Sequence, residues 1–275
     1  MIGQLKRVIE LKELQENRTV EDKKNIITFT SGKGGVGKTV ISLNSAFSLS
    51  KMGYKVLFVD LDLNFSNATI LLNTTANKNL FHFLSGKNLV KHIIKKIDDN
   101  FYLLPGYSGV INEEYYTNNY LSSLITELKR TANEYDFLFI DTGQIVNLQQ
   151  LDILLNSYLN VILLTPEPTA VMDAYAILKM LKQKNFCNDK IVLVNKCEHK
   201  EEAVDTFSNL NNASLHFLKE KLNFAGFISS DPNIHSSILQ QSLFMKNYIH
   251  SVAYTQIIAL NKKLIDFIQV ANITQ

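Results

Sequence analysis

The sequence predicts an α/β fold, in which a doubly wound, mostly parallel sheet carries helices on both faces. Two observations predict it. Short apolar runs rich in Val, Ile and Phe recur along the 275 residues without the alternation of a half-buried strand, so these strands are expected to be buried on both faces. Stretches of helical length separate the runs, as the connections of a parallel sheet require. The runs are Ile26–Thr30, Val56–Val59, Phe137–Ile140, Val161–Leu164 and Ile191–Val194, with weaker ones at Tyr102–Leu104 and Phe224–Ile228.

The helices between these strands are expected at Val40–Met52, Leu121–Asn133, Asp173–Lys184 and Ala203–Lys221. Residues 1–24 precede the first strand, and their few apolar residues among many charges predict a short N-terminal helix followed by a polar tether. Residues 25–275 then form one domain. It ends in an amphipathic helix, Thr255–Ala271, whose apolar arc we expect to pack on the sheet, with docking on a membrane surface as the alternative.

Composition excludes several classes of protein. With 46% hydrophobic and 20% charged residues, the chain is neither collagen-like nor disordered. Its 28 Lys and Arg against 26 Asp and Glu give a net charge of +2, so no global attraction to nucleic acid is expected. Two cysteines without metal-type spacing, Cys187 and Cys197, indicate a reducing compartment. No apolar run approaches the ~18 residues that span a bilayer, so we expect a cytoplasmic chain that at most touches a membrane from the side.

Local lysine clusters do not change this expectation about nucleic acid. We interpret them as solvated helix faces, because charged residues at helical spacing usually cover the side of a helix that faces water. The clusters are Lys91, Lys95 and Lys96, and then Lys179, Lys182 and Lys184.

A glycine-rich loop follows the first strand directly. Gly32-Lys33-Gly34-Gly35-Val36-Gly37-Lys38-Thr39 matches the phosphate-binding pattern G-x-x-x-x-G-K-[ST] between a strand and a helix. The glycines let backbone N–H groups face phosphate oxygens, Lys38 adds a positive charge, and the Thr39 hydroxyl is placed to bind Mg²⁺. We therefore expect a nucleoside triphosphate. A dinucleotide site that uses Asp60, or a turn without a ligand, leaves Lys38 and Thr39 unexplained.

Three acids follow the strands that flank this loop. Asp60 and Asp62 end the second strand, and the period of a strand makes them project the same way. One can hold Mg²⁺ through water while the other orients or deprotonates the attacking water; capping of the loop is the alternative. Asp141 closes the strand Phe137–Ile140 and is expected to hold Mg²⁺ through water. We therefore assign Asp60, Asp141 and Thr39 to the metal, and Asp62 to catalysis.

The second position of the loop carries an additional cation, Lys33. With it, Gly32–Thr39 resembles the deviant Walker A motif of the MinD/ParA family of P-loop NTPases. The resemblance implies an ATPase domain over residues 25–275, an ATP-dependent homodimer, and a Lys33 that reaches the phosphates of the partner copy. Asp62 then falls on the family's water-activating position, and Lys33 and Lys38 assist catalysis at the phosphates.

The same resemblance extends to the segments around the acids, with two departures. Asn67 matches the family's D-x-D-x-G-x-x-N segment, but Asn64 replaces its glycine. After Asp141, Gln144 and Ile145 replace the last two residues of D-T-G-A-G. Loss of these glycines is expected to alter the rate of hydrolysis more than the binding of nucleotide.

Two further residues are expected near the base of the nucleotide. Asn195 ends the strand Ile191–Val194, and its amide can donate to and accept from an adenine edge at once; capping of a turn is the alternative. Gly226–Asp231 resembles the family's base-flanking G-x-I-P-x-D, with Ser229 in place of proline. The resemblance therefore adds Asp231 to the nucleotide site.

One branch of the family shares more with this chain. Thr165–Tyr175 resembles the T-P-E-P-T-x-x-x-D-A-Y signature of the flagellar number regulators (FlhG, FleN, YlxH), and Asp231–Ile234 and Gln240-Gln241 also resemble that branch. This implies control of flagellar number or placement, with flagellar components and an FlhF-type GTPase as partners. Separately, the amphipathic pattern of the C-terminal helix predicts a weak membrane contact in the dimer, where two weak anchors hold better than one. Of the branch's N-terminal D-Q-A-x-x-L-R motif only Gln4 survives, so stimulation of such a GTPase is not expected.

Two alternatives of other classes stay open. One is a ParA-like ATPase that partitions DNA, and the other is a nucleotide-binding scaffold with negligible hydrolysis.

Overall fold

In the computed structural model, the predicted loop follows an inner strand of the sheet. The structure describes residues 24–62, 66–107, 118–144, 148–186 and 188–273. Within these residues the sheet has eight strands in the order β3-β4-β2-β5-β1-β6-β7-β8, and all neighbours run parallel except the β3–β4 edge pair. The strands are β1 (Ile26–Ser31), β2 (Val56–Leu61), β3 (Lys95–Asp98), β4 (Phe101–Leu104), β5 (Phe137–Gln144), β6 (Leu159–Leu164), β7 (Asp189–Cys197) and β8 (Asn223–Ser229).

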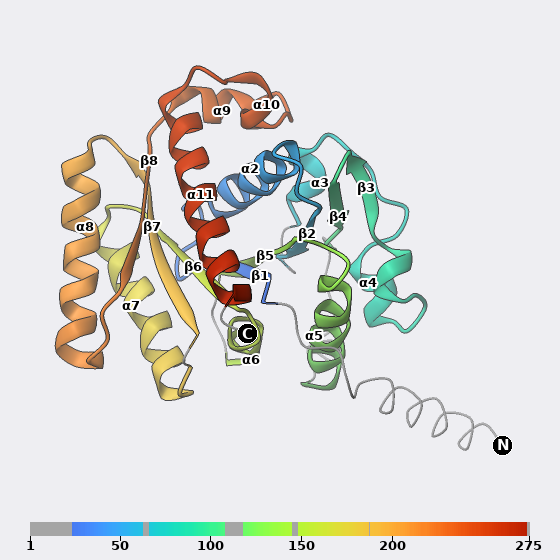
Figure 1. Cartoon of the computed structure of the whole chain (residues 1–275), viewed down its shortest axis with the longest axis horizontal. Coiled ribbons are helices and arrows are strands. Elements are labelled where there is room, and N and C mark those ends of the chain that lie inside the picture. Colours follow the sequence, from blue (N-terminus) through green and yellow to red (C-terminus); the bar gives the residue numbers. More distant parts are fainter. Residues whose placement is uncertain (1–23, 63–65, 108–117, 145–147, 187, 274–275) are drawn as a thin grey trace.

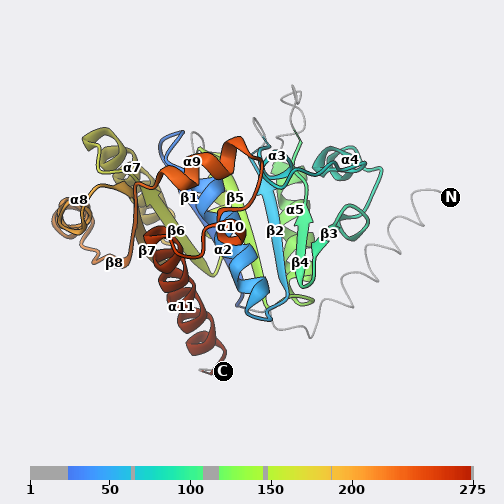
Figure 2. The ribbon, with the colours of Figure 1, turned by 90° about the horizontal axis from the view of Figure 1, so that it is seen from above.

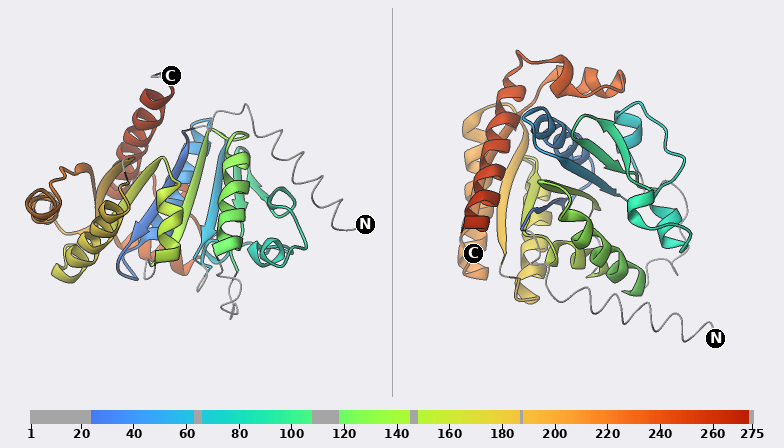
Figure 3. Two further views of the ribbon diagram at one scale, coloured as in Figure 1. Left: turned by 90° about the horizontal axis from the view of Figure 1, so that it is seen from below. Right: turned by 45° about the vertical axis from the view of Figure 1, so that its right-hand side comes forward.

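Helices cover both faces of this sheet, so the predicted doubly wound α/β fold is confirmed. Helices α2 and α11 lie on one face, and α5, α6, α7 and α8 lie on the other (Figures 1 and 3). The helices are α2 (Lys38–Lys51), α3 (Ala68–Leu71), α4 (Leu80–Leu84), α5 (Asn118–Ala132), α6 (Leu148–Leu155), α7 (Pro168–Gln183), α8 (Lys200–Ala213), α9 (Pro232–Leu239), α10 (Phe244–Asn247) and α11 (Val252–Ile273), with a 3₁₀ turn η1 (Val90–His92) and a π-helical turn η3 (Ser214–Leu218).

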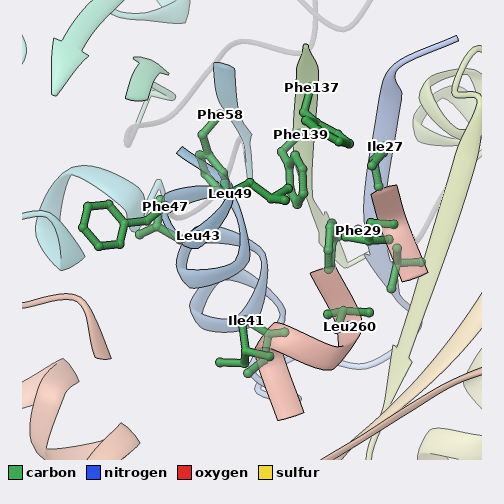
Figure 4. Packing of buried hydrophobic residues seen from close by; sticks show 14 of the residues in the cluster. Ile27, Phe29, Ile41, Leu43, Phe47, Leu49, Phe58, Phe137, Phe139 and Leu260 are labelled. Atoms are coloured by element: carbon green, nitrogen blue, oxygen red, sulfur yellow. The ribbon is translucent and has the colours of Figure 1, made fainter. Parts of the chain in front are cut away.

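The main core lies between the central strands and α2. All six residues of β1 are buried, as its unbroken apolar pattern predicts. Phe29 stacks on Phe139 of β5 with ring centroids 5.3 Å apart, and Leu49 of α2 lies beside Phe139 (Figure 4). Leu43 of α2 is buried in the same cluster. Burial of each such side chain contributes ~1.5–3 kcal/mol. This packing fixes α2, and with it the loop from which α2 begins.

The apolar arc of α11 belongs to the same core. Ile257, Leu264 and Ile268 are buried against the sheet and α2, and Asn261 donates from its side chain to the Ser45 carbonyl at 3.2 Å. The expected packing of the C-terminal helix is confirmed. Apart from Lys24, the predicted N-terminal helix and tether lie outside the described residues.

One element was predicted wrongly. Lys95 and Lys96 were expected on a helix face with Lys91, but both lie on the antiparallel edge strand β3, while Lys91 lies in η1. A strand of four residues that is not buried on both faces shows no apolar run, and lysine is typical of sheet edges because it opposes pairing with another chain. No described helix has the length and hydrophobicity that a membrane span needs.

Candidate functional site

A cavity of about 1050 Å³ lies at the edge of the sheet where the parallel strands end. Along this edge the loop after β1 lies beside α9 (Figure 2). Residues of the loop, α3 and α9 line the cavity together. Of the predicted site residues, those that line the cavity are Lys33, Gly34, Gly35, Val36, Gly37, Lys38, Thr39, Asp62, Asn195 and Asp231. Asp60 and Asp141 are buried and do not contribute to this lining.

The loop has the backbone geometry that its glycines were expected to allow. Gly35 and Gly37 have φ values of +75° and +91°, in the left-handed region that disfavours other residues. A Cβ on Gly37 would lie 2.5 Å from Asn195 Nδ2, and one on Gly32 would lie 2.6 Å from the backbone of Asp173 in the second turn of α7. The loop is therefore enclosed by β7 on one side and α7 on the other.

A buried ion pair lies behind the loop. Lys38 Nζ donates to Asp141 Oδ1 at 3.2 Å, and the two side chains are 8% and 0% exposed. Burial raises the pKa of the Asp141 carboxyl, which the Lys38 ammonium and the Thr39 hydroxyl oppose. Asp141 Oδ2 is buried and has no hydrogen-bond partner among the described residues. An acceptor with unused capacity beside a hydroxyl and a phosphate loop fits Mg²⁺, which keeps most of its waters.

No group of three or more His, Cys, Asp and Glu in the described part of the chain could hold a metal ion alone.

Asp60 lies beside Asp141 but contacts the following loop. Its Oδ2 accepts hydrogen bonds from Ser66 Oγ at 2.8 Å and from Ala68 N at 3.0 Å, and its Oδ1 accepts one from Asp62 N at 3.2 Å. Burial, and then the charge of Asp141, raise the pKa of Asp60 to about 7. The carboxyl therefore has the loop-capping contacts that the sequence left as an alternative.

The segment after Asp141 is tied to the phosphate loop. Gln144 Nε2 donates to the Gly32 carbonyl at 2.7 Å, and a Cβ on Gly143 would lie 3.1 Å from Asp62 Oδ1. Asp62 thus lies between this segment and the cavity, which it lines. The departures Asn64 and Ile145 lie outside the described residues.

Lys33 contacts the segment after β6. Its ammonium forms an ion pair with Glu167 and donates to Thr169 Oγ at 3.2 Å. Hydrogen bonding from Lys33 and its charge lower the pKa of the Glu167 carboxyl. These partners come from the T-P-E-P-T signature, which was not predicted to contact Lys33. Their proximity follows from the sheet, in which β6 pairs with β1.

Asn195 and Asp231 have partners within the protein. Asn195 is 4% exposed, and its Nδ2 donates to the Val36 carbonyl at 2.7 Å. Asp231 caps α9 by accepting from Asn233 N at 2.8 Å, and it also binds the Ser251 hydroxyl. Lys196, which the sequence did not single out, also lines the cavity, and its Nζ donates to the Gly35 carbonyl at 2.8 Å. Its place directly after Asn195 at a strand end was the only signal.

Comparison with known proteins agrees with this geometry. The family model for an AAA domain matches residues 24–193. The flagellum site-determining protein YlxH of Helicobacter pylori is 29% identical over 268 residues, which cover 94% of this chain and 90% of the relative. The antiactivator FleN of Pseudomonas aeruginosa is 25% identical over 239 residues, which cover 87% and 85%.

Among solved structures, the septum site-determining protein MinD of Pyrococcus horikoshii, complexed with Mg-ADP, has a TM-score of 0.73 at 25% identity and covers 87% of this chain and 95% of its own. The resemblance seen in the loop around Lys33 thus extends through the sheet and over most of the chain. Because the family match spans more than half of its residues, the chain belongs to the AAA domain family, in the MinD/ParA group.

Proposed function

We propose that the chain is an ATP-binding and ATP-hydrolysing switch that forms a homodimer with ATP and controls flagellar number or placement. The observation that carries the proposal is the complete phosphate loop at the cavity, with Lys38, Thr39 and Asp141 gathered behind it. The names of YlxH and FleN support the flagellar role, and the Mg-ADP complex of the related MinD supports the choice of ligand.

Each residue has a task in this proposal. Mg²⁺·ATP supplies the phosphoanhydride bond and a cation that neutralises charge on the phosphates. The backbone of Gly32–Thr39 and the Lys38 ammonium bind the phosphates, while Thr39 and Asp141 hold Mg²⁺, Asp141 through water. Asp62 orients or deprotonates the attacking water. Asp60 acts on the metal site indirectly, because its carboxylate accepts hydrogen bonds from Asp62 N and Ala68 N and so holds the segment that carries Asp62.

Lys33 links nucleotide to dimerisation. Its side chain is 39% exposed at the cavity, and its ion pair with Glu167 is half in solvent, where such a pair contributes little. A small free energy therefore suffices to release the ammonium toward the phosphates of a second copy.

The partners proposed beyond the second copy are flagellar components, including an FlhF-type GTPase. A weak peripheral membrane contact could use α11 only if its buried arc left the sheet, so we assign the membrane no role in the switch. Nothing in the described residues favours the DNA-partitioning alternative.

A scaffold with negligible hydrolysis is the second candidate, and one observation favours it. Gln144, which stands where the family has alanine, bonds to the Gly32 carbonyl and so restrains the segment that follows Asp141. Release of phosphate from Mg²⁺·ATP decides between the two. We expect steady release by the parent and at least a hundredfold loss in Asp62→Ala, since proton transfer contributes ~10²–10⁴ in rate. If the parent releases phosphate no faster than Asp62→Ala does, the chain is a scaffold with negligible hydrolysis.

A further inference from the structure

Two consecutive residues at the end of β7 hold two consecutive peptide units of the phosphate loop. Asn195 Nδ2 donates to the Val36 carbonyl, and Lys196 Nζ donates to the Gly35 carbonyl. A peptide unit is planar and trans, so its N–H points away from its C=O. Carbonyls held toward β7 therefore turn the N–H groups of Val36 and Gly37 away from β7. Successive N–H groups of this kind are the donors that bind phosphate oxygens in such loops.

An irregular backbone brings both side chains to the loop. Successive side chains of a regular strand point to opposite faces of the sheet. Here the pairing of β7 with β8 shifts between Asn195 and Cys197, and Lys196 has a φ of +59°. This bulge directs two neighbouring side chains to the same side. The left-handed conformation is unfavourable for lysine, and such strain persists where surrounding contacts maintain it.

Close packing makes the contact rigid. A Cβ on Gly37 would lie 2.5 Å from Asn195 Nδ2 and 4.0 Å from Lys196 Cε, so both side chains lie directly against the loop. Asn195 is buried, whereas Lys196 is exposed and lines the cavity. The amide nitrogen that was predicted to meet adenine is already bonded to the loop.

We propose that Asn195 and Lys196 form a clamp, defined by their bonds to Val36 and Gly35, that orients the phosphate loop for a diphosphate group before nucleotide arrives. The proposal rests on the proposed nucleotide-binding function and makes both side chains positioning residues in place of a base contact by Asn195. Donors that are oriented in advance need no reorganisation on binding, which increases affinity.

The test uses four variants of the full chain and three probes. Lys196→Gly removes the ammonium and suits the positive φ, and Asn195→Ala removes the amide. Lys196→Arg keeps a cationic donor. Lys219→Gly is the matched control, because Lys219 is also an exposed lysine with a positive φ, +56°, and does not line the cavity. The affinities of Mg²⁺·ADP, Mg²⁺·GDP and pyrophosphate are measured by competition with a fluorescent ADP.

The clamp predicts a loss of affinity that does not depend on the base of the nucleotide. Lys196→Gly and Asn195→Ala each lower the affinities for ADP and for pyrophosphate by the same factor, about three- to tenfold for the loss of one hydrogen bond. Both variants keep the parent's preference between ADP and GDP. Lys196→Arg and Lys219→Gly bind like the parent. Without nucleotide, amide hydrogens of the loop exchange faster in Lys196→Gly than in Lys219→Gly.

Other outcomes overturn the clamp. If Asn195→Ala loses the preference for ADP over GDP while pyrophosphate binds as before, Asn195 contacts the base. Parent-like affinities in both Lys196→Gly and Asn195→Ala also overturn it. A parent that binds neither ADP nor pyrophosphate refutes the proposed function itself, which separates the two failures.

Discussion

Two buried carboxyls, Asp60 and Asp141, face each other across neighbouring strands. They are register partners on β2 and β5 and are 1% and 0% exposed. Lys38 compensates the charge of Asp141, while Asp60 accepts hydrogen bonds from the loop that follows it. With a pKa of about 7, Asp60 is partly protonated at neutral pH, which reduces the repulsion between the two groups.

This raised pKa makes stability depend on pH. The pKa of Asp60 rises from 3.8 to about 7 on folding, so the folded state binds more protons between these values. Its contribution to stability is therefore fully present below about pH 3.8 and is lost as the pH rises from there through about 7. We expect the free energy of unfolding in urea to fall by a few kcal/mol more in the parent than in Asp60→Asn between pH 5 and pH 8. Equal decreases in both proteins would contradict the assigned titration.

Gly37 is required for a reason that Gly53 lacks. Both have left-handed φ values, +91° and +98°, but only a Cβ on Gly37 would collide with a neighbour, Asn195. We expect Gly37→Ala and Gly53→Ala each to lose about 1 kcal/mol of stability through backbone strain. Only Gly37→Ala should also weaken ADP binding, by more than tenfold. An ADP titration that shows equal affinities in the two variants would refute the close contact between the loop and β7.

Among the elements, α11 packs the apolar side of its amphipathic pattern against the sheet and leaves the other side exposed. Leu264 is fully buried, whereas Val252 at the start of the same helix is 65% exposed. We expect Leu264→Ala to lower the free energy of unfolding by about 2–5 kcal/mol and Val252→Ala by less than about 0.5 kcal/mol. Urea unfolding followed by circular dichroism measures both. A small effect of Leu264→Ala would show that the helix does not depend on the sheet.

Elements that are long or buried on both faces could be predicted from the sequence. Strands such as β1 and β6 have unbroken apolar patterns, and α2 starts from a recognisable loop. The short elements could not be predicted: α3 and α10 have four residues each, fewer than two turns, so no periodicity develops. The edge strand β3 contains two lysines and is not buried on both faces, which removes the apolar signal.

The residues of the site also differ in how far the sequence could predict them. Lys38 and Thr39 could be assigned from the motif alone, because their neighbours in the loop are also neighbours in sequence. The contacts of Lys33 with Glu167 and of Lys196 with Gly35 join segments more than 130 residues apart. They depend on the strand order β1-β6-β7 and on the bulge in β7, neither of which a single sequence specifies.

For the molecule as a whole, Lys33 is the proposed link between the nucleotide and a second copy. We expect Lys33→Ala to bind ATP within about threefold of the parent, since Lys38 and the loop remain, but to stay monomeric by light scattering. Lys51→Ala is the control, because it removes another exposed ion pair, with Asp98, at the end of α2 that is opposite the loop. Dimerisation of Lys33→Ala to the extent seen in the parent would refute this role.

The central claim is that the loop Gly32–Thr39 binds Mg²⁺·ATP. Calorimetric titration of the parent with a non-hydrolysable ATP analogue and Mg²⁺ tests it most directly. The account predicts saturable heat with one nucleotide bound per chain, and weaker binding when Mg²⁺ is removed. Titration without any heat of binding, from a folded sample, would contradict it.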